Sequence, residues 1–206
     1  MESIVQPKNI IFDIGNVLVK WAPKEVVVKL FSNHPDHDDL TFKLFKSPTW
    51  FDLNKGKLTE AEAVQIYNQK LGVPLKKLQE LMHEVKESLT PMEGSFELLE
   101  DLYQAKISLY SITDNVHEIV TFLKNKYTFF DKFKGIAISA ELGVLKPAKE
   151  IYNHLLQTYN LRPEESIFFD DIQKNVDGAK NVGMQATLFT TALTCREELI
   201  NQGFIF

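Results

Sequence analysis

The sequence has a single cysteine, no long apolar run and no excess of positive charge. Cys195 alone excludes an internal disulfide, and it stands outside any cluster containing histidine, so we assign it no catalytic role. No apolar run approaches the roughly 20 residues that a membrane helix needs, and the first residues lack a signal-peptide pattern. The formal charge of −5 argues against a nucleic-acid surface. We therefore expect a cytoplasmic protein that binds neither nucleic acid nor membrane.

Strand and helix patterns alternate through most of the chain. Short apolar runs of the kind that form buried parallel strands occur at Asn9–Ile14, Ile107–Ile112, Gly135–Ser139, Ser166–Asp170 and Gln185–Phe189. Helical patterns lie between or after them at Glu97–Gln104, His117–Lys126, Lys149–Tyr159, Asn175–Val182 and Arg196–Gln202. This alternation predicts an α/β fold of Rossmann-like type, with right-handed crossovers and a parallel sheet covered on both faces.

Residues from about 23 to 90 interrupt the alternation, because they contain helical patterns but no convincing strand. The patterns cover Glu25–Phe31, Thr59–Leu71 and Leu75–Leu89, and Thr59 with Glu62 forms a capping box. We expect a core domain of residues 1–20 and 91–206, with residues 21–90 inserted as a helical cap domain.

Polar residues stand where four of the predicted strands end. Ligands of open parallel sheets bind beyond these ends. The residues are Asp13, Ser111, Lys146 in a loop after the third strand, and the pair Asp170 and Asp171. Each alone has an ordinary explanation as a turn, cap or solvated residue, so the functional hypothesis rests on their combination.

In order and setting, these residues resemble the four motifs of the haloacid dehalogenase-like superfamily. The motifs are FDIGNVLV, LYSIT, LKPAKEIY and FFDDIQKN, and the resemblance extends from Ile10 to about Leu188. The combination of FDIGN, KPxxxIY and DDxxxN is similar to the motifs of one branch of this superfamily, which contains sugar-phosphate phosphatases and the N-terminal phosphatase domain of epoxide hydrolases. The resemblance places the family's helical cap where the inserted helical segment occurs.

The resemblance implies a magnesium-dependent phosphatase. A phosphate monoester is anionic, so its hydrolysis requires charge neutralisation and an attacking group held in line. Asp13 would attack phosphorus and form an aspartyl-phosphate. The Mg²⁺ ligands implied by the family are the Asp13 carboxylate, the Gly15 carbonyl and the Asp171 carboxylate.

The remaining motif residues receive supporting roles from the same resemblance. Lys146 would compensate phosphoryl charge and restrain the carboxylates, and Ser111 would donate to a phosphoryl oxygen, with Thr113 as its rival. Asp170 stands where glycine is frequent. Asn175 stands where a second aspartate is frequent, and it would orient Asp171 or a metal-bound water, or cap a helix.

Gly15 is the largest departure from the family pattern. Family phosphatases usually carry an aspartate two positions after the nucleophile, where it protonates the leaving oxygen and later activates water. Gly15 can do neither, so a metal-bound water, Asp170 or Asp114 would have to serve. The other reading of Gly15-Asn16 is a turn that needs positive φ.

Several alternatives remain open on the sequence. The leading hypothesis is hydrolysis of a small phosphorylated metabolite, with a sugar phosphate expected; a noncatalytic binding module is the second, favoured by Gly15 and Ile112. A dehalogenase is the third, and Asp171 argues against it because that reaction needs no metal. We read residues 32–39, SNHPDHDD, as a solvated loop, and Trp21, Trp50 and Phe51 as core residues.

Overall fold

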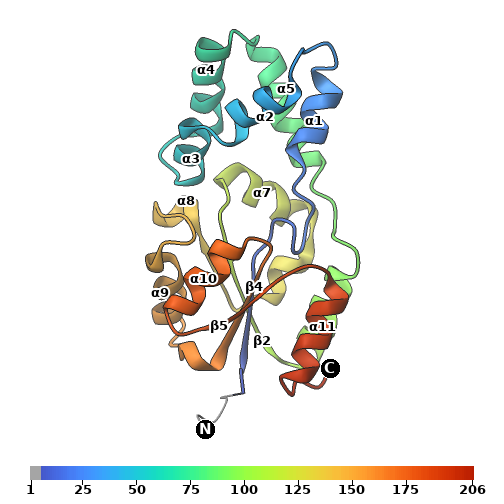
Figure 1. Ribbon diagram of the computed structural model, residues 1–206, viewed down its shortest axis with the longest axis vertical. Coiled ribbons are helices and arrows are strands. Elements are labelled where there is room, and N and C mark those ends of the chain that lie inside the picture. Colours follow the sequence, from blue (N-terminus) through green and yellow to red (C-terminus); the bar gives the residue numbers. More distant parts are fainter. Residues whose placement is uncertain (1–5) are drawn as a thin grey trace.

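The computed structural model describes residues 6–206, in which a five-stranded parallel sheet lies below a group of helices (Figure 1). The strands are β1 (Asn9–Phe12), β2 (Ser108–Thr113), β3 (Gly135–Ile138), β4 (Ser166–Asp170) and β5 (Gln185–Leu188), in the order β3-β2-β1-β4-β5. Phe12 at the end of β1 is paired with Ser111 of β2 and Phe169 of β4. The predicted α/β parallel-sheet fold is confirmed.

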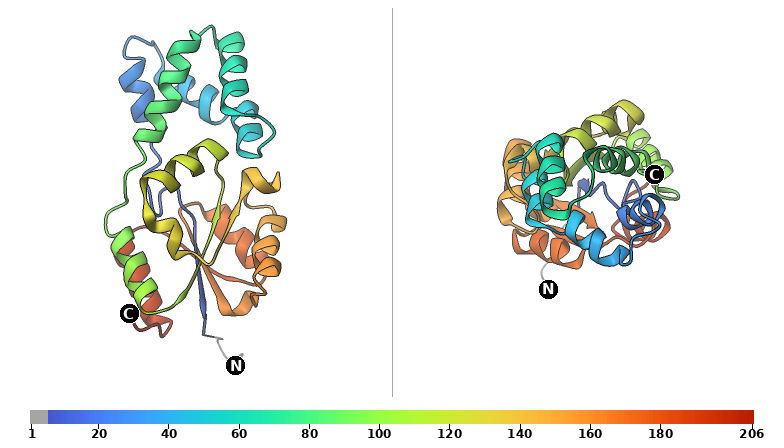
Figure 2. Two further views of the ribbon diagram at one scale, coloured as in Figure 1. Left: turned by 180° about the vertical axis from the view of Figure 1, so that it is seen from behind. Right: turned by 90° about the horizontal axis from the view of Figure 1, so that it is seen from above.

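Helices cover both faces of the sheet, and the alternation of side chains along β1 explains why. Ile10 and Phe12 enter one buried apolar cluster, whereas Ile11 enters another on the opposite face. The first face carries α6 (Ser95–Gln104), α7 (His117–Lys126) and α11 (Ala192–Asn201), and the second carries α9 (Lys149–Thr158) and α10 (Gln173–Asn181) (Figures 1 and 2). A strand that is apolar on both sides is thereby buried on both sides.

Five helices lie beyond the carboxyl ends of the strands (Figures 1 and 2). They are α1 (Pro23–Leu30), α2 (His37–Phe45), α3 (Pro48–Asn54), α4 (Glu60–Leu71) and α5 (Leu75–Glu87). We refer to this set, α1–α5, as the upper helices. Helix α4 begins with the predicted capping box of Thr59 and Glu62. No helix in residues 6–206 combines the length and the apolar character needed to cross a membrane.

Helices α2 and α3 were not predicted, and α2 corrects the reading of residues 32–39 as a loop. The Asp36 side chain accepts a hydrogen bond from the Asp39 backbone N–H at 2.9 Å, which caps α2 at its amino end. His37, Asp38 and Asp39 therefore form the first helical turn. The acidic residues interact favourably there with the amino end of the helix dipole.

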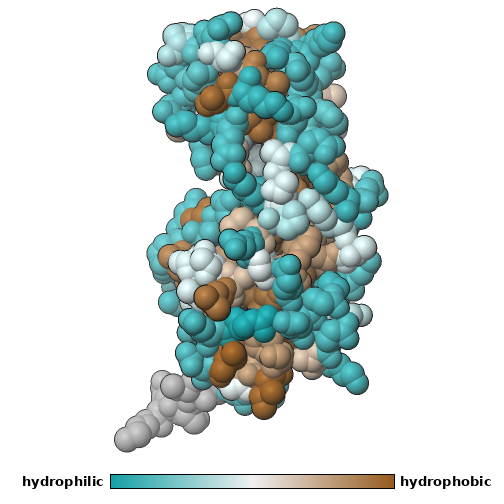
Figure 3. All heavy atoms as spheres, turned by 90° about the vertical axis from the view of Figure 1, so that its right-hand side faces the viewer, coloured by the Kyte–Doolittle hydropathy of each residue, from teal (hydrophilic) through white to brown (hydrophobic). Residues whose placement is uncertain are grey.

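Specific contacts join the upper helices to the sheet part of the molecule. Ser139, which begins α8 (Ser139–Leu142), donates from Oγ to the Asn54 carbonyl oxygen at 2.7 Å. A Cβ atom on Gly56 would lie 2.1 Å from the Ala140 carbonyl oxygen, so this approach requires glycine. The outline of the molecule narrows between its two parts (Figure 3). The upper helices thus sit over the strand ends.

Candidate active site

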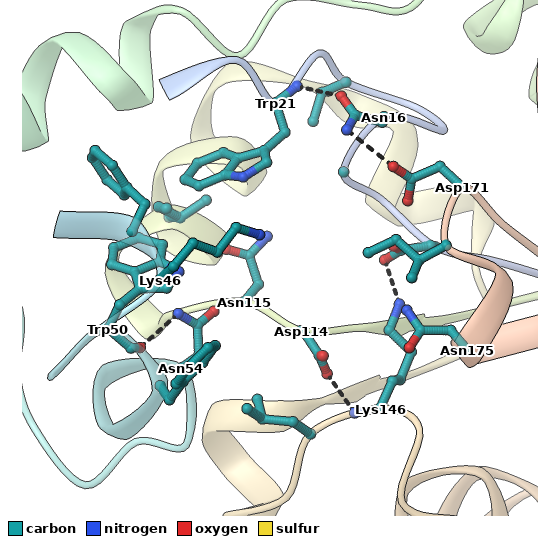
Figure 4. Close-up of a pocket in the computed structure, with 18 of the residues that line it drawn as sticks. Asn16, Trp21, Lys46, Trp50, Asn54, Asp114, Asn115, Lys146, Asp171 and Asn175 are labelled. Carbon is teal, nitrogen blue, oxygen red and sulfur yellow. Dashed lines mark hydrogen bonds and ion pairs between the residues drawn. The ribbon is translucent and has the colours of Figure 1, made fainter. Parts of the chain in front are cut away.

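Four segments that are distant in the sequence meet at one cavity of about 190 Å³ between the strand ends and the upper helices. Asp13 directly follows β1, Asp114 follows β2, and Asp171 follows β4. Lys146 comes from the loop between α8 and α9. Neighbouring parallel strands end at the same edge of the sheet, which is why these side chains converge. Figure 4 shows Asp114, Lys146 and Asp171 around the cavity.

Lys146 lies at the centre of a buried group of charges. Its side chain is 1% exposed, and Nζ lies 2.9 Å from Asp13 Oδ1 and 2.7 Å from Asp170 Oδ2. The same ammonium donates to the Ile112 carbonyl oxygen at 3.2 Å. Three acceptors therefore use its three protons, and the ammonium is held in one position.

Asp170 is fully buried and surrounded by donors. Its carboxylate accepts from Lys146 Nζ, from the Ile172 backbone N–H at 2.8 Å, and from Asn175 Nδ2 at 3.0 and 3.1 Å. Asn175 was expected to orient Asp171 or a metal-bound water, but its amide binds Asp170 instead. Asp170 and Asn175 together hold Lys146 in place beside Asp13.

Asp171 is positioned by Asn16, a residue that the sequence analysis did not single out for this role. Asn16 Nδ2 donates to Asp171 Oδ2 at 3.0 Å, and Asn16 Oδ1 accepts from the Trp21 backbone N–H at 2.9 Å (Figure 4). The backbone φ of Asn16 is 54°, so the expected positive φ falls on Asn16. The Gly15 backbone has no such requirement, and a Cβ there would meet only the Trp21 Cβ, at 3.7 Å.

Burial and crowding of like charges shift the acidities in the cavity. Burial raises the pKa of Asp13 to about 8; nearby Lys146 acts to lower it and Asp170 acts to raise it. Burial also raises the pKa values of Asp114 and Asp171. The protein by itself provides more carboxylates here than the single buried ammonium can balance.

The donor set fits a divalent cation. Carboxylate oxygens of Asp13, Asp170 and Asp171 lie within 4.8 Å of one another. Both Asp170 oxygens accept hydrogen bonds from protein donors, whereas Asp13 pairs with Lys146 through Oδ1 and Asp171 accepts from Asn16 through Oδ2. Oxygen ligands and excess negative charge suit Mg²⁺, which takes few protein ligands. Asp13 and Asp171, with the adjacent Gly15, fit this role better than Asp170 does.

Ser111 does not line the cavity, contrary to its expected contact with a phosphoryl oxygen. It is fully buried within β2, opposite Phe12, and its hydroxyl has no hydrogen-bond partner. Thr113, the expected rival, is the last residue of β2 and directly precedes Asp114, which does line the cavity. The strand continues one residue further than predicted, which moves its end from Ile112 to Thr113.

The upper helices supply the other side of the cavity. Trp21 stacks on Trp50 with ring centroids 5.6 Å apart, and Phe45 packs edge-on against Trp50 at 5.0 Å. These rings pack together and also line the cavity, so the reading of the tryptophans as core residues is incomplete. The same reading is wrong for Phe51, which lines the cavity and is 42% exposed. The polar residues of the lining that sequence reasoning missed are Asn16, Lys46, Asn54, Asn115 and Lys174. Of these, Asn16 lies within the motif FDIGNVLV and Lys174 within FFDDIQKN, whereas the other three lie outside the motifs.

Comparisons with known proteins agree with this architecture. Residues 10–189 match the family of haloacid dehalogenase-like hydrolases. The sesquiterpene phosphatase AstK of Aspergillus oryzae is 29% identical over 191 residues, covering 92% of this chain and 94% of the relative. A D-ribitol-5-phosphate phosphatase of Bacteroides thetaiotaomicron is 24% identical over 203 residues, covering 93% and 96%.

Solved structures show the same fold. The crystal structure of a family enzyme from Bacteroides thetaiotaomicron, in complex with magnesium and inorganic phosphate, superposes with a TM-score of 0.74. The identity is 21%, and the match covers 90% of this chain and 95% of the other. The family match includes the strands and all four polar strand ends. The chain belongs to the haloacid dehalogenase-like hydrolases.

Proposed function

We propose that the protein is a phosphoric monoester hydrolase that uses Mg²⁺ and the Asp13 carboxylate to hydrolyse a small phosphorylated metabolite. The observation that carries the proposal is the meeting of Asp13, Lys146 and Asp171 at one cavity, with Lys146 Nζ 2.9 Å from Asp13. Phosphatases among the relatives support the reaction class. In this proposal, residues 1–20 and 91–206 form the catalytic core, and residues 21–90 form the cap.

Asp13, Gly15 through its carbonyl, and Asp171 would hold the metal. When bound, Mg²⁺ supplies positive charge that neutralises phosphoryl oxygens and favours the ionised form of the carboxylates. The hydrogen bond from Asn16 fixes the orientation of Asp171. Such support of a metal ligand by a neighbouring side chain commonly determines metal affinity.

In the first step, an Asp13 carboxylate oxygen attacks phosphorus and the ester P–O bond breaks. The leaving oxygen takes the electron pair of that bond and a proton, and Asp13 carries the phosphoryl group. The charge of Lys146 acts to lower the Asp13 pKa, which favours the ionised carboxylate that attacks, and the ammonium holds that carboxylate in position. Thr113, at the end of β2, is as buried as Ser111 and likewise does not line the cavity, so neither hydroxyl is assigned as the donor to a phosphoryl oxygen.

Asp114 is the candidate for the proton donor that Gly15 cannot provide. It lines the cavity, and one of its oxygens accepts from the Lys146 backbone N–H at 3.0 Å. Burial raises its pKa, which increases its protonated fraction. Asp170, the other carboxyl considered, is surrounded by donors and is an unsuitable acid. In the second step, Asp114 accepts a proton from the water that attacks phosphorus, which releases phosphate and regenerates Asp13.

The substrate proposal is a small phosphate ester, such as a sugar phosphate. Its support is the cavity of about 190 Å³ between the strand ends and the upper helices, a size that suits a compact ester. A noncatalytic binding module is the second candidate, favoured by Gly15. The carboxylates gathered around Lys146 oppose it, because their repulsion is costly in a protein that makes no use of a cation.

Turnover of p-nitrophenyl phosphate with and without Mg²⁺ separates the two candidates. The proposed function predicts release of p-nitrophenol that depends on Mg²⁺ and is lost in Asp13→Asn. Asp177→Asn, an exposed change on α10, is the matched control and should retain activity. No turnover of this or any other phosphate ester would favour the binding module. Activity that persists in excess EDTA would remove the metal from the mechanism.

A further inference from the structure

The two sides of the cavity differ in charge. The sheet side presents Asp13, Asp114 and Asp171, whereas the upper side presents the stacked rings of Trp21 and Trp50. In the proposed function, the residues of the sheet side bind the phosphoryl group and the metal. The upper side is left to contact the leaving group, which must point away from Asp13 for in-line attack.

Lys46 is the one charged residue on the upper side of the cavity lining in residues 6–206. It directly follows α2, and its backbone N–H donates to the Phe42 carbonyl oxygen at 2.9 Å, which fixes the start of the side chain. Figure 4 shows its ammonium extending into the cavity beside Asn115. The part of the chain described by the structure provides it with no ion-pair partner.

Lys174, the other lysine besides Lys146 that lines the cavity, has a different setting. It lies on α10, on the sheet side, and its charge acts on Asp114. Lys174 thus faces a carboxylate of the protein itself. Lys46 is the cavity cation whose counter-charge the described chain does not supply.

The amides near Lys46 add a further donor. Asn115 Oδ1 accepts from the Val116 backbone N–H at 3.1 Å, so its Nδ2 is the part of the amide that remains for a ligand. Asn54 Nδ2 donates to the Trp50 carbonyl oxygen at 2.8 Å. An ammonium has donors and no acceptor. Lys46 is exposed to solvent, so an anionic group on a ligand in this space would gain an ion pair there, whereas an uncharged ligand would leave the ammonium hydrated.

We propose that Lys46 binds a second anionic group, such as a carboxylate, on the leaving group of the phosphate ester. The inference rests on the phosphatase function proposed above and adds the chemical class of the substrate. Lys46 is a specificity-determining residue in this account. It takes no part in the transfer of the phosphoryl group, which occurs on the sheet side.

The test measures binding, so that it does not depend on turnover. Asp13→Asn protein loaded with Mg²⁺ is titrated calorimetrically with 3-phosphoglycerate and with glycerol 3-phosphate, which differ by a carboxylate in place of a hydroxymethyl group. We expect about tenfold tighter binding of 3-phosphoglycerate, the value of one charge-assisted hydrogen bond. Adding Lys46→Met should abolish that preference and leave the affinity for glycerol 3-phosphate unchanged.

Lys43→Met is the matched control, because Lys43 lies on α2 three residues before Lys46 and pairs with Asp39 on the surface. The control should keep the preference. Equal affinity for the two esters, no binding of either, or a preference that survives Lys46→Met would overturn the inference. If the wild type hydrolyses p-nitrophenyl phosphate but shows no preference, the Lys46 inference alone fails. If the preference is present and no ester is hydrolysed, the phosphatase proposal alone fails.

Discussion

Replacing Lys146 with methionine tests whether one buried ammonium holds the carboxylates of the cavity together. The change keeps an apolar side chain of similar length but removes the partner of both Asp13 and Asp170. The side chains of Lys146 and Asp170 are 1% and 0% exposed, so solvent cannot replace the lost charge. Removal of one member of a buried ion pair costs about 3–5 kcal/mol. We expect a loss of this size in the unfolding free energy at pH 8.5 without metal.

The loss should be smaller at low pH. Asp13 has a folded-state pKa raised to about 8, so the folded protein binds more protons than the unfolded chain between roughly pH 4 and pH 8. This group therefore contributes less stability as the pH rises through that window. Without Lys146 the pKa rises further, because the ammonium acts to lower it. At pH 5.5 the protonated Asp13 carboxyl no longer needs a cation, and the penalty of the variant decreases.

Urea unfolding of wild type and Lys146→Met at pH 5.5 and pH 8.5, in EDTA, measures both effects. Lys180→Met, an exposed change at the end of α10, is the control for loss of one positive charge, and it should be nearly neutral. The reasoning would be refuted by a loss below about 1 kcal/mol at pH 8.5, or by a loss of equal size at the two pH values.

Three further predictions concern the chemistry. Asp114→Asn should lower kcat/KM for alkyl phosphates by about 10² to 10⁴, and much less for p-nitrophenyl phosphate, whose leaving group needs little protonation; an equal loss on both substrates would refute the proton-donor role. Gly15→Asp should fold, since a Cβ there meets only Trp21. The wild type should prefer glucose 1-phosphate, and the variant should have a higher kcat/KM for glucose 6-phosphate relative to glucose 1-phosphate. A clear wild-type preference for the 6-phosphate would show that the acid is already efficient. Mg²⁺ affinity, measured by calorimetry, should weaken as the pH falls because Asp13 and Asp171 have raised pKa values. An affinity independent of pH between 6 and 8.5 would contradict the assigned ligands. Ca²⁺, with its looser coordination shell, should inhibit turnover.

The positions of Asp13 and Asp171 were accessible from the sequence because each follows a buried strand with a strong apolar pattern. The hydrophobic run Ile10-Ile11-Phe12 and the run Ile167-Phe168-Phe169 fix those strand ends closely. The second motif was harder to place, since Ser111, Ile112 and Thr113 are all compatible with a strand. The end of β2 at Thr113 is set by its pairing with Ile138 of β3, a contact that is distant in the sequence.

Partnerships between separate loops could not be predicted from local patterns. Asn16 binds Asp171 because the ends of β1 and β4 lie side by side, and Asn175 binds Asp170, five residues before it, because of the way the chain turns from β4 into α10. Sequence spacing indicates which residues belong to a motif but does not specify which amide faces which carboxylate. Lys46 was inaccessible for a similar reason, since its direction depends on how the unpredicted helix α2 packs over the cavity.

The central claim, that Asp13 takes the phosphoryl group from the substrate, is tested most directly by mass spectrometry of acid-quenched protein during turnover. Wild-type enzyme mixed with Mg²⁺ and p-nitrophenyl phosphate should gain the mass of one phosphoryl group on the peptide that contains Asp13, and Asp13→Asn should gain none. Turnover without any such labelled peptide in a quench within the first catalytic cycle, or the label on a different residue, would contradict the account.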